Sequence, residues 1–425
     1  MSIVSICFRQ IAEIKEEGWI AVQRKARSAT IKLPIYLFGC ALAVPIVLFV
    51  RLIRPFKLVR FGPVRSDVIG HSVFDPEYYL CERELTNSKT LDFFYFEGKK
   101  FPNEQWKLML RRTLRINNIF RYLDKTNLLM PGGKIHHKIM CTTGSRDIKG
   151  YLAETKPHIT FTSEEDRQGR LFTDELGVKR SDRFVCLIVR DSAYKEKFQK
   201  WRNRDWSYHG YRDSNIDTYE DAALALAEKG YWVFRMGKMG HKSFKAAHPR
   251  ILDYANSEYR SDFLDIWLMA NCFLAISTST GLDDVSVVFR RPILFVNHLP
   301  VGDSRTGSTK YMEAFKKMRW KETGQYLSLR EQIDCGAIRF YSTNEYERLG
   351  IEIIDDTQDE IKSTVLEFEK QLDGQNNELT AKEEGLKKQF WNIMAEWKDY
   401  SKYHGKRRAI IGNSFLCKNH DWFLA

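Results

Sequence analysis

Apolar runs alternate with amphipathic stretches through the middle of the chain. Three continuous apolar runs, at 183–189, 272–276 and 292–296, have the length and composition of buried strands. Between them, residues 218–230 and 261–271 carry apolar side chains at helical spacing. Strands that alternate with helices of this length predict a parallel, doubly wound sheet. Ligands of such sheets bind at the carboxyl ends of the strands.

Capping residues mark where several of these helices begin and end. Asp217 and Glu220 have the spacing of a capping box, and Gly230 is placed to end the same helix. Ser261 is the expected N-cap of the next helix. Asn103 is the expected N-cap of a further helix in the first half of the chain.

The first half repeats the alternation, with strands expected at 56–62 and 91–96. We therefore predict an α/β fold of two Rossmann-like parallel-sheet domains that face one another across a cleft. The first domain would occupy 56–175 and bind the acceptor, and the second would occupy 176–350 and bind a nucleotide sugar. The charged, amphipathic helices of 351–425 would pack on these domains or bridge them.

One stretch near the start is apolar enough to enter a membrane. Residues 33–50 contain no charge and are just long enough to cross a bilayer. Pro45 would kink a helix there, and basic residues flank the stretch on both sides, so its orientation is open. We predict that 1–55 is membrane-associated, with 2–22 lying as an amphipathic helix on the surface. A full span, a re-entrant or monotopic insertion and a long buried core helix are the alternatives for 33–50.

The chain is basic, with 67 Lys and Arg residues against 55 Asp and Glu and a formal net charge of +12. Such an excess suits a nucleic acid, a membrane surface or a phosphorylated substrate, although simple solubility also accounts for it. The sequence contains no known nucleic-acid motif, so we predict no nucleic-acid partner. Eight cysteines stand singly without a CxxC pair, which favours reduced core residues over a zinc site or a disulfide framework.

Hydroxyl residues and a glycine gather where the run at 272–276 meets the next helix. They are Ser277, Thr278, Ser279, Thr280 and Gly281. Unpaired backbone amides and the helix dipole lie at such a turn, so this cluster could wrap a phosphate. A plain N-cap needs one hydroxyl rather than four. Asp283 and Asp284 follow, either favoured there by the helix dipole or gripping a ribose or sugar hydroxyl.

Arginines at other strand ends are the expected partners of a diphosphate. Arg190 ends the run at 183–189, and Arg235 ends a further predicted strand, with Gly237 allowing a base or ribose to approach. The expected ligand contacts from neighbouring loops are Tyr194, His209 and Arg212. We find neither a D-x-D motif in a suitable loop nor a histidine cluster at metal spacing, so we predict no metal.

The loop at 61–71 supplies the expected proton acceptor. Arg65, Asp67 and His71 would project from it into the cleft, where a carboxylate or imidazole could take the proton of an acceptor hydroxyl. Asp67 is the first candidate for this catalytic role and His71 the second.

The stretch at 273–297 resembles the nucleotide-sugar loop of GT-B glycosyltransferases. Thr280, Gly281 and Leu282 match the T-G-L tripeptide of heptosyltransferases, and Asp67-Val68 matches their D-V pair, whose Asp acts as general base. Ser279 and Asp284 depart from that pattern. A wider stretch, 56–370, resembles a family of bacterial glycosyltransferases from surface-polysaccharide gene clusters.

These resemblances imply a metal-independent glycosyltransferase of surface-polysaccharide synthesis. It would need no cofactor and would move a sugar from a nucleotide-sugar co-substrate to a lipid-linked or glycan acceptor. The expected location is the cytoplasmic face of the bacterial inner membrane. The alternatives are a sugar-nucleotide epimerase, a pyruvyl transferase, or a non-catalytic membrane scaffold with a degenerate sugar-nucleotide pocket.

Overall fold

The computed structural model describes residues 30, 33–98, 100–191, 207–238, 242–375 and 379–425. These residues form two compact units. The first unit contains the described residues up to 64 together with 89–97 and 114–139, and the second contains those in 65–88, 98–113 and 140–425.

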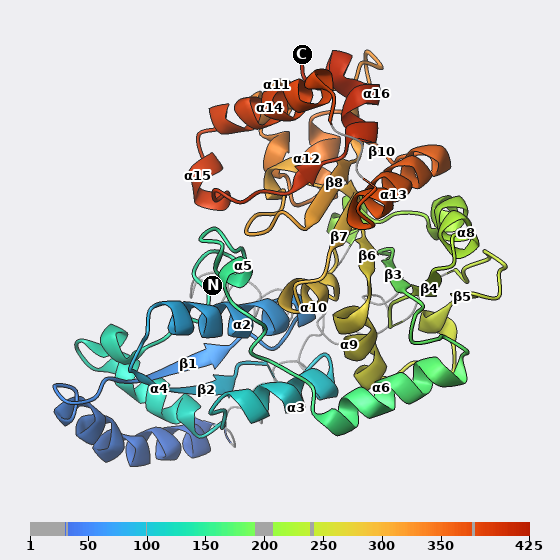
Figure 1. The fold of residues 1–425 in the computed structure, drawn as a ribbon. Helices are drawn as coiled ribbons and strands as arrows, with labels where there is room; N and C mark the ends of the chain where they lie inside the picture. The colour runs from blue at the N-terminus through green and yellow to red at the C-terminus, as the bar shows by residue number, and fades with distance from the viewer. Residues whose placement is uncertain (1–29, 31–32, 99, 192–206, 239–241, 376–378) are drawn as a thin grey trace. The chain divides into compact units, whose positions relative to one another are not determined.

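The second unit is built on a seven-stranded sheet in which all neighbouring strands are parallel (Figure 1). The strands are β3 (Phe184–Ile188), β4 (Trp232–Arg235), β5 (Ile251–Leu252), β6 (Leu274–Ser277), β7 (Ile293–His298), β8 (Tyr311–Phe315) and β11 (Ile410–Ile411). Their order is β11-β8-β7-β6-β3-β4-β5. Along the chain, β4 and β5 are added on one side of β3. The later strands β6, β7, β8 and β11 are then added in turn on its other side. This is the doubly wound order, and its direction reverses between β3 and β6.

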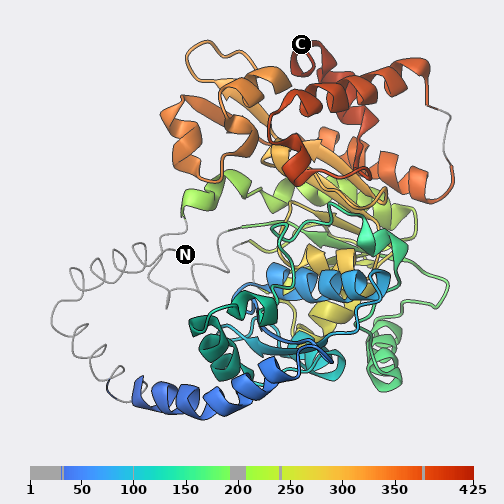
Figure 2. The same cartoon turned by 90° about the vertical axis from the view of Figure 1, so that its left-hand side faces the viewer.

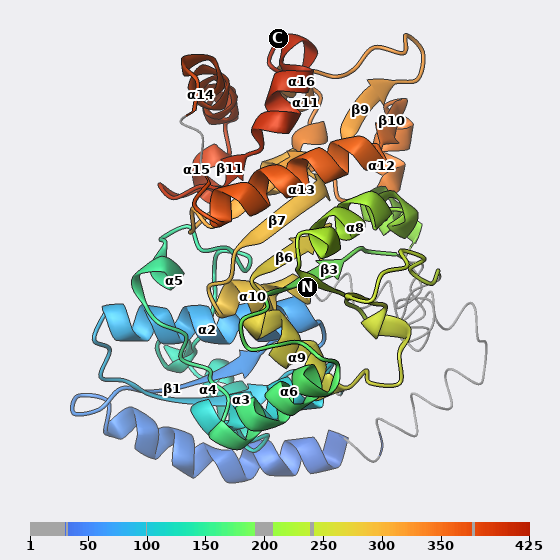
Figure 3. The same ribbon diagram turned by 45° about the vertical axis from the view of Figure 1, so that its right-hand side comes forward.

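Both faces of this sheet are covered by helices, which explains why its strands are continuously apolar. On one face, Val185, Leu187 and Ile276 share a core with α8 (Glu220–Glu228) and α13 (Gln358–Leu372). On the other face, the ring of Phe184 stacks on Trp267 of α9 (Asp262–Asn271), with centroids 6.4 Å apart. Figure 3 shows α8 and α13 on the first face and α9 on the second.

Four more helices of the second unit lie on the α9 side of the sheet. They are α2 (Ile69–Leu85), α3 (Glu104–Thr113), α6 (Ser163–Glu175) and α10 (Asp283–Val288), and α5 (Tyr151–Glu154) packs on α2. α2 packs on α10, and α3 packs on α9. The side chain of Asn103 donates to the carbonyl of Asp262 at 2.8 Å and accepts from the amide of Trp106 at 2.9 Å. Asn103 is therefore the N-cap that the sequence predicts.

The C-terminal part of the second unit adds a small antiparallel pair and a layer of helices. The pair is β9 (Lys317–Trp320) with β10 (Ile351–Ile354). The helices are α11 (Leu329–Asp334), α12 (Thr343–Arg348), α14 (Ala381–Glu396), α15 (Tyr400–Tyr403) and α16 (Asn413–Phe423). Phe315 at the end of β8 stacks on Phe390 of α14 at 5.7 Å, which joins this layer to the large sheet.

The first unit contains a parallel pair, β1 (Val59–Val64) with β2 (Leu91–Phe96). Isolated parallel bridges extend the pair on both sides, from Phe61 to His137 and from Phe94 to Ile116. Helix α4 (Phe120–Leu129), the 3-10 turn η1 (Gly133–His136) and a helix at Leu33–Leu52 complete the unit. The helix at Leu33–Leu52 is the one described helix that is long and apolar enough to cross a membrane, judged by length and composition.

The predicted α/β fold with parallel, Rossmann-like sheets and an apolar N-terminal helix is confirmed, and the N-caps at Asn103 and Ser261 are correct. The predicted capping box at Asp217 and Glu220 is wrong, because a 3-10 turn, η4 (Ile216–Tyr219), precedes α8. The side chain of Asp217 instead lies 2.8 Å from Lys242. The predicted surface helix at 2–22 lies outside the described residues. The seven described cysteines are all free, and Cys417 is exposed rather than in the core.

Candidate active site

A cavity of about 670 Å³ opens at the carboxyl ends of β3, β4, β6 and β7, and all the residues that line it belong to the second unit. Five stretches provide most of its wall: 67–71, 143–146, 188–191, 235–238, and 279–282 with Asp284. Because the strand order reverses between β3 and β6, the loops after these two strands diverge and leave this space open. The cavity thus lies where a doubly wound sheet binds its ligand.

The hydroxyl cluster after β6 divides into residues that hold the loop and residues that line the cavity. Ser277 donates to Asp283 Oδ2 at 2.6 Å, and the hydroxyl of Thr278 accepts from the backbone amide of Arg190 at 2.9 Å. The side chains of Ser277, Thr278 and Asp283 are buried, and none of the three lines the cavity. Ser279, Thr280, Gly281 and Asp284 do line it.

The expectation that free backbone amides of this turn would wrap a phosphate is wrong for two of its residues. The amide of Thr280 donates to Asp283 Oδ2 at 2.7 Å, and the amide of Ser279 donates to the hydroxyl of Ser277 at 3.1 Å. The hydroxyl of Thr280 is buried against the cavity and has no hydrogen-bond partner in the described chain. At these two positions the backbone amides are occupied, and the loop presents the side-chain hydroxyl of Thr280 to a ligand.

The arginines predicted at the strand ends come together in the cavity wall. Arg190 follows β3, Arg235 ends β4, and Arg212 belongs to the 3-10 turn η3 (Ser207–Arg212). Arg190 Nε lies 2.9 Å from Asp213, and Arg235 lies 3.1 Å from Asp253. The Nε atoms of Arg212 and Arg235 are buried and make no hydrogen bond within the described chain, so each offers a donor to a bound anion.

Cationic side chains outnumber carboxylates in the wall of the cavity. The cations are Arg146, Arg190, Arg212, Arg235, Lys238, Arg305 and Arg339. The carboxylates are Asp67, Asp191, Asp265, Asp284 and Asp303. Burial lowers the pKa of Arg212, and the nearby charge of Arg190 lowers it further. A group of opposite charge would relieve this repulsion, so the wall is suited to an anion.

The loop before α2 and the first turn of that helix bring the expected proton acceptors, Asp67 and His71, to the cavity. Asp67 and His71 line it, whereas Arg65 does not. His71 Nδ1 lies 2.7 Å from the hydroxyl oxygen of Ser145, and that hydroxyl donates to Asp75 Oδ1 at 2.6 Å. Since the hydroxyl proton is directed at Asp75, its oxygen accepts from Nδ1–H of His71. The other ring nitrogen, Nε2, is then left without a proton and can act as a base.

The surroundings of His71 favour its neutral form. Burial, together with the charge of Arg65, lowers the pKa of His71 to about 4. Burial raises the pKa of Asp75 to about 6, although its hydrogen bond with Ser145 opposes the shift. At neutral pH, His71 is therefore an uncharged base and Asp75 is ionised.

Sequence reasoning missed Arg146, Arg305 and Arg339. Arg305 follows β7 and lies 3.6 Å from Asp283 and 3.7 Å from Asp284. The position of Arg305 beyond a strand end was a usable signal, because every such loop of a parallel sheet borders the same edge. Arg146 stands in a Thr-Gly-Ser loop that carries no periodic pattern.

Two expected ligand contacts cannot be placed in this geometry. Tyr194 lies outside the described residues, and so does the side chain of His209. Gly237 lines the cavity with a φ of +142°, a backbone conformation that favours glycine.

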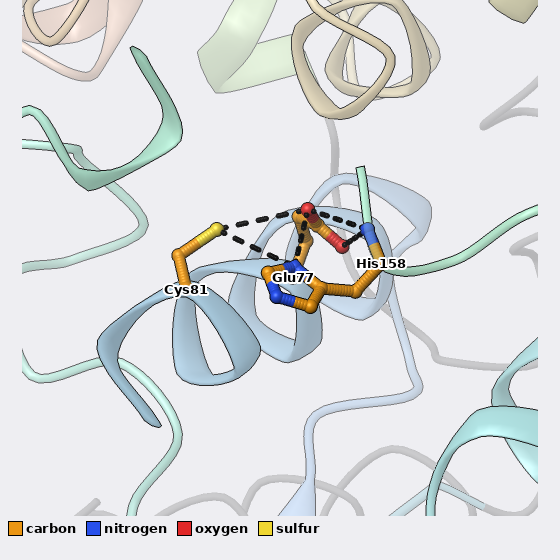
Figure 4. A group of neighbouring side chains, drawn as sticks. All are labelled: Glu77, Cys81 and His158. Atoms are coloured by element: carbon orange, nitrogen blue, oxygen red, sulfur yellow. Dashed lines mark hydrogen bonds and ion pairs between the residues drawn. The ribbon is translucent and has the colours of Figure 1, made fainter. Parts of the chain in front are cut away.

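Away from the cavity, Glu77, Cys81 and His158 approach one another as metal ligands do (Figure 4). Arg290 also joins this group, with Nη2 at 2.8 Å from Glu77 Oε1 and 3.4 Å from Cys81 Sγ. His158 Nδ1 lies 3.2 Å from the same Glu77 oxygen. Two cationic partners already compensate the buried carboxylate, and a metal ion would be repelled by Arg290. The group is best described as an ion-pair cluster that ties α2 to the residues after α5 and α10.

No family model matches the chain, and no curated protein matches it in sequence. Solved structures do resemble it. Escherichia coli ADP-heptose LPS heptosyltransferase II matches at 10% identity with a TM-score of 0.35, over 60% of this chain and 90% of that one. A glycosyl transferase family 9 protein from Veillonella parvula matches at 12% identity with a TM-score of 0.36, over 56% and 80% of the two chains. E. coli heptosyltransferase WaaC with ADP-2-deoxy-2-fluoro heptose matches at 12% identity with a TM-score of 0.33, over 60% and 93%. Values this low do not carry an activity over to this chain.

Proposed function

We propose that this chain is a metal-independent glycosyltransferase that moves a sugar from a nucleotide-sugar donor to a lipid-linked or glycan acceptor. The pathway would be bacterial surface-polysaccharide synthesis, at the cytoplasmic face of the inner membrane. The observation that carries the proposal is that strand-end arginines, the Thr280 hydroxyl and an oriented histidine line the same cavity. The first two features suit a diphosphate, and the third suits an acceptor hydroxyl.

The diphosphate of the donor would be held by Arg190, Arg212 and Arg235. Guanidinium groups pair with phosphate oxygens in a bidentate manner. Arg190 and Arg235 line the cavity from the ends of the adjacent strands β3 and β4, and Arg212 lines it from η3. When the nucleoside diphosphate leaves, negative charge grows on its oxygens, and fixed cations stabilise that charge in the transition state. A wall with seven cationic side chains can supply this stabilisation without a metal ion.

His71 would accept the proton of the acceptor hydroxyl, with Asp67 as the alternative base. The acceptor oxygen bonds to the anomeric carbon while its proton passes to His71 Nε2. The bond between that carbon and the diphosphate oxygen breaks, and its electron pair stays on the oxygen. The hydrogen bond of Nδ1 to Ser145 fixes the tautomer that leaves Nε2 free for this step.

The donor is identified by measuring the melting temperature of the purified full chain with nucleoside diphosphates and nucleotide sugars in the presence of EDTA. We expect the ligands that carry one particular base to raise the melting temperature. Arg190→Gln should weaken this binding by roughly tenfold or more, because a charge-assisted hydrogen bond is lost. Arg167→Gln, an exposed change on α6, is the matched control.

The reaction is tested with the stabilising nucleotide sugar and a lipid extract from a polysaccharide-producing bacterium. Labelled sugar should appear in the lipid fraction as nucleoside diphosphate is released. Conversion of the sugar nucleotide into an isomer without any acceptor would instead identify an epimerase. A protein that binds the nucleotide sugar but alters neither substrate would be a scaffold. Loss of transfer with EDTA and its return with manganese would contradict a metal-independent reaction.

A further inference from the structure

The apolar helix Leu33–Leu52 is attached along one side to the rest of the first unit (Figures 2 and 3). Near its start, the ring of Tyr36 lies 5.7 Å from that of Tyr122 in α4. In its middle, Ala43 and Val47 are buried in a cluster with Leu123 and residues of β1. The three positions are seven and four residues apart, so they lie on one face of the helix.

Polar contacts strengthen the same attachment. The hydroxyl of Thr126 donates to the carbonyl of Cys40 at 3.2 Å. At the other end of the helix, Arg51 donates to the carbonyl of Pro131 at 2.8 Å and to the side chain of Asn127 at 2.9 Å. Contacts from Tyr36 to Arg51 cover a length of roughly 22 Å at the rise of an α-helix. The helix is thus fixed to the unit over most of its length.

The opposite side of the helix carries apolar side chains that the described residues leave exposed. Phe38 is 67% exposed, and Leu42 and Phe49 are each 59% exposed. Only 17% of the most apolar 18-residue window is buried, which argues against the alternative of a buried core helix. An exposed apolar side chain also follows the helix at Phe56, which is 90% exposed. We call the exposed apolar side chains from Phe38 to Phe56 the apolar face.

The charge of the first unit suits an anionic surface. Its described residues include ten Lys and Arg side chains but only three carboxylates, Asp92, Glu97 and Asp124. Asp92 and Asp124 are buried. Arg54 and Lys57, which follow the helix, and Lys125 of α4 are exposed. Basic residues beside an exposed apolar surface are typical of binding to anionic lipid.

We infer that the helix Leu33–Leu52 lies in the plane of an anionic bilayer, with the apolar face in the lipid and the docked face on the protein. A helix that crossed the bilayer would bring the structures docked along it into the hydrocarbon core. Those structures include Asn127 with its bond to Arg51 and the buried carboxylate of Asp124, bonded to His137 at 2.7 Å. Such polar groups are strongly disfavoured at membrane depth. This inference needs no assumption about the sugar-transfer reaction.

Depth measurements with nitroxide labels separate the two geometries. Phe38, Leu42 and Phe49 lie within about 40° of one another around the helix and are spread over roughly 16 Å of its length. Each is replaced by a labelled cysteine in a full chain whose accessible native cysteines are replaced, bound to vesicles of equal parts phosphatidylcholine and phosphatidylglycerol. We expect the three labels to report the same depth in the outer part of one leaflet. Depths that differ along the helix, with the deepest label in its middle, would show a spanning helix and overturn the inference.

Flotation with the same vesicles tests whether the apolar face binds an anionic bilayer. Phe49→Glu should reduce the bound fraction at least tenfold, and Leu349→Glu, at a partly exposed leucine of the second unit, should not. Both variants should melt as the unaltered protein does, because both side chains are exposed. Binding that is equal for phosphatidylcholine alone would contradict the role of the basic residues. A lipid-free dimer that immobilises all three labels would show that a second copy covers the apolar face instead.

Discussion

A Cβ atom placed on Gly281 would lie 2.9 Å from the backbone nitrogen of Gly70. Such a distance is too short for a real Cβ atom, so the two segments meet backbone to backbone. One segment is the turn that contains Thr280, and the other is the start of α2, which contains His71 and follows Asp67. This contact brings the expected diphosphate site and the expected proton acceptors to the same cavity.

Gly281→Ala should therefore push the two segments apart. We expect nucleotide binding to weaken and transfer to fall by at least tenfold, because reacting groups displaced by about an ångström lose much of their rate. Gly385→Ala is the matched control, since nothing lies within 4 Å of its added Cβ in the described chain. That change lies within α14 and should raise the free energy of unfolding by up to about 1 kcal/mol. Equal effects of the two substitutions on binding would contradict the role of the contact.

The hydroxyls of Thr280 and Ser277 should respond in opposite ways to removal. Thr280→Val removes a buried hydroxyl that has no partner in the described chain, so the melting temperature should stay the same or rise. Nucleotide binding should weaken, because the ligand loses its hydrogen bond. Ser277→Ala leaves the buried carboxylate of Asp283 without one donor and should cost about 1–3 kcal/mol of stability. Calorimetry with and without the nucleotide measures both quantities. Thr280→Val that binds as tightly as the unaltered chain would exclude a ligand at this hydroxyl.

The pH dependence of transfer should identify the base. A general base must be unprotonated, so activity falls when the pH drops through its pKa. The pKa of His71 is lowered to about 4, by burial and then by Arg65, so we expect activity to persist at pH 5. Asp75 and Arg65 are the charged groups next to this imidazole. Arg65→Gln removes the repelling cation and should move the acid limb of the kcat/KM profile to higher pH. If the acid limb of the profile does not move in this variant, Asp67 is favoured as the general base.

Ser145 and Asp75 position His71 rather than contact the substrate. Ser145→Ala removes the acceptor for Nδ1–H and should lower kcat by roughly tenfold to hundredfold with little change in KM. Asp75→Asn should lower kcat less, because its amide can still accept from the hydroxyl of Ser145. Steady-state kinetics at a saturating donor concentration measures the effects on kcat and on KM separately. A rise in KM without a fall in kcat would show that these residues only shape the pocket.

Much of the sheet could be predicted because β3, β6 and β7 are buried on both faces and therefore appear as unbroken apolar runs. The ends of those runs also located Arg190 and Thr280. Which hydroxyls of the cluster face the cavity could not be predicted, since that depends on the hydrogen bonds that Asp283 accepts from the Ser277 hydroxyl and the Thr280 amide. Ser145 comes from a loop that follows α2 by many residues and reaches His71 only in the folded chain.

The cluster of Glu77, Cys81, His158 and Arg290 should make stability depend on alkaline pH (Figure 4). Hydrogen bonds with Cys81 and Glu77 raise the pKa of His158 to about 10, although burial opposes the shift. The folded-state pKa lies above the unfolded value, so the proton on His158 stabilises the fold. That stabilisation is complete below about pH 6.5 and is lost as the pH rises toward 10.

His158→Gln should therefore lower the melting temperature at pH 7 and flatten its dependence on pH between 7 and 10. Near pH 10 the variant and the unaltered protein should differ least, because the imidazole has by then lost its proton. His420→Gln, on α16 and far along the chain from this cluster, is the control and should leave the slope unchanged. Melting curves in metal-free buffer and with added zinc complete the test. A zinc-dependent rise in melting temperature that disappears in Cys81→Ser would show that the cluster binds metal despite Arg290.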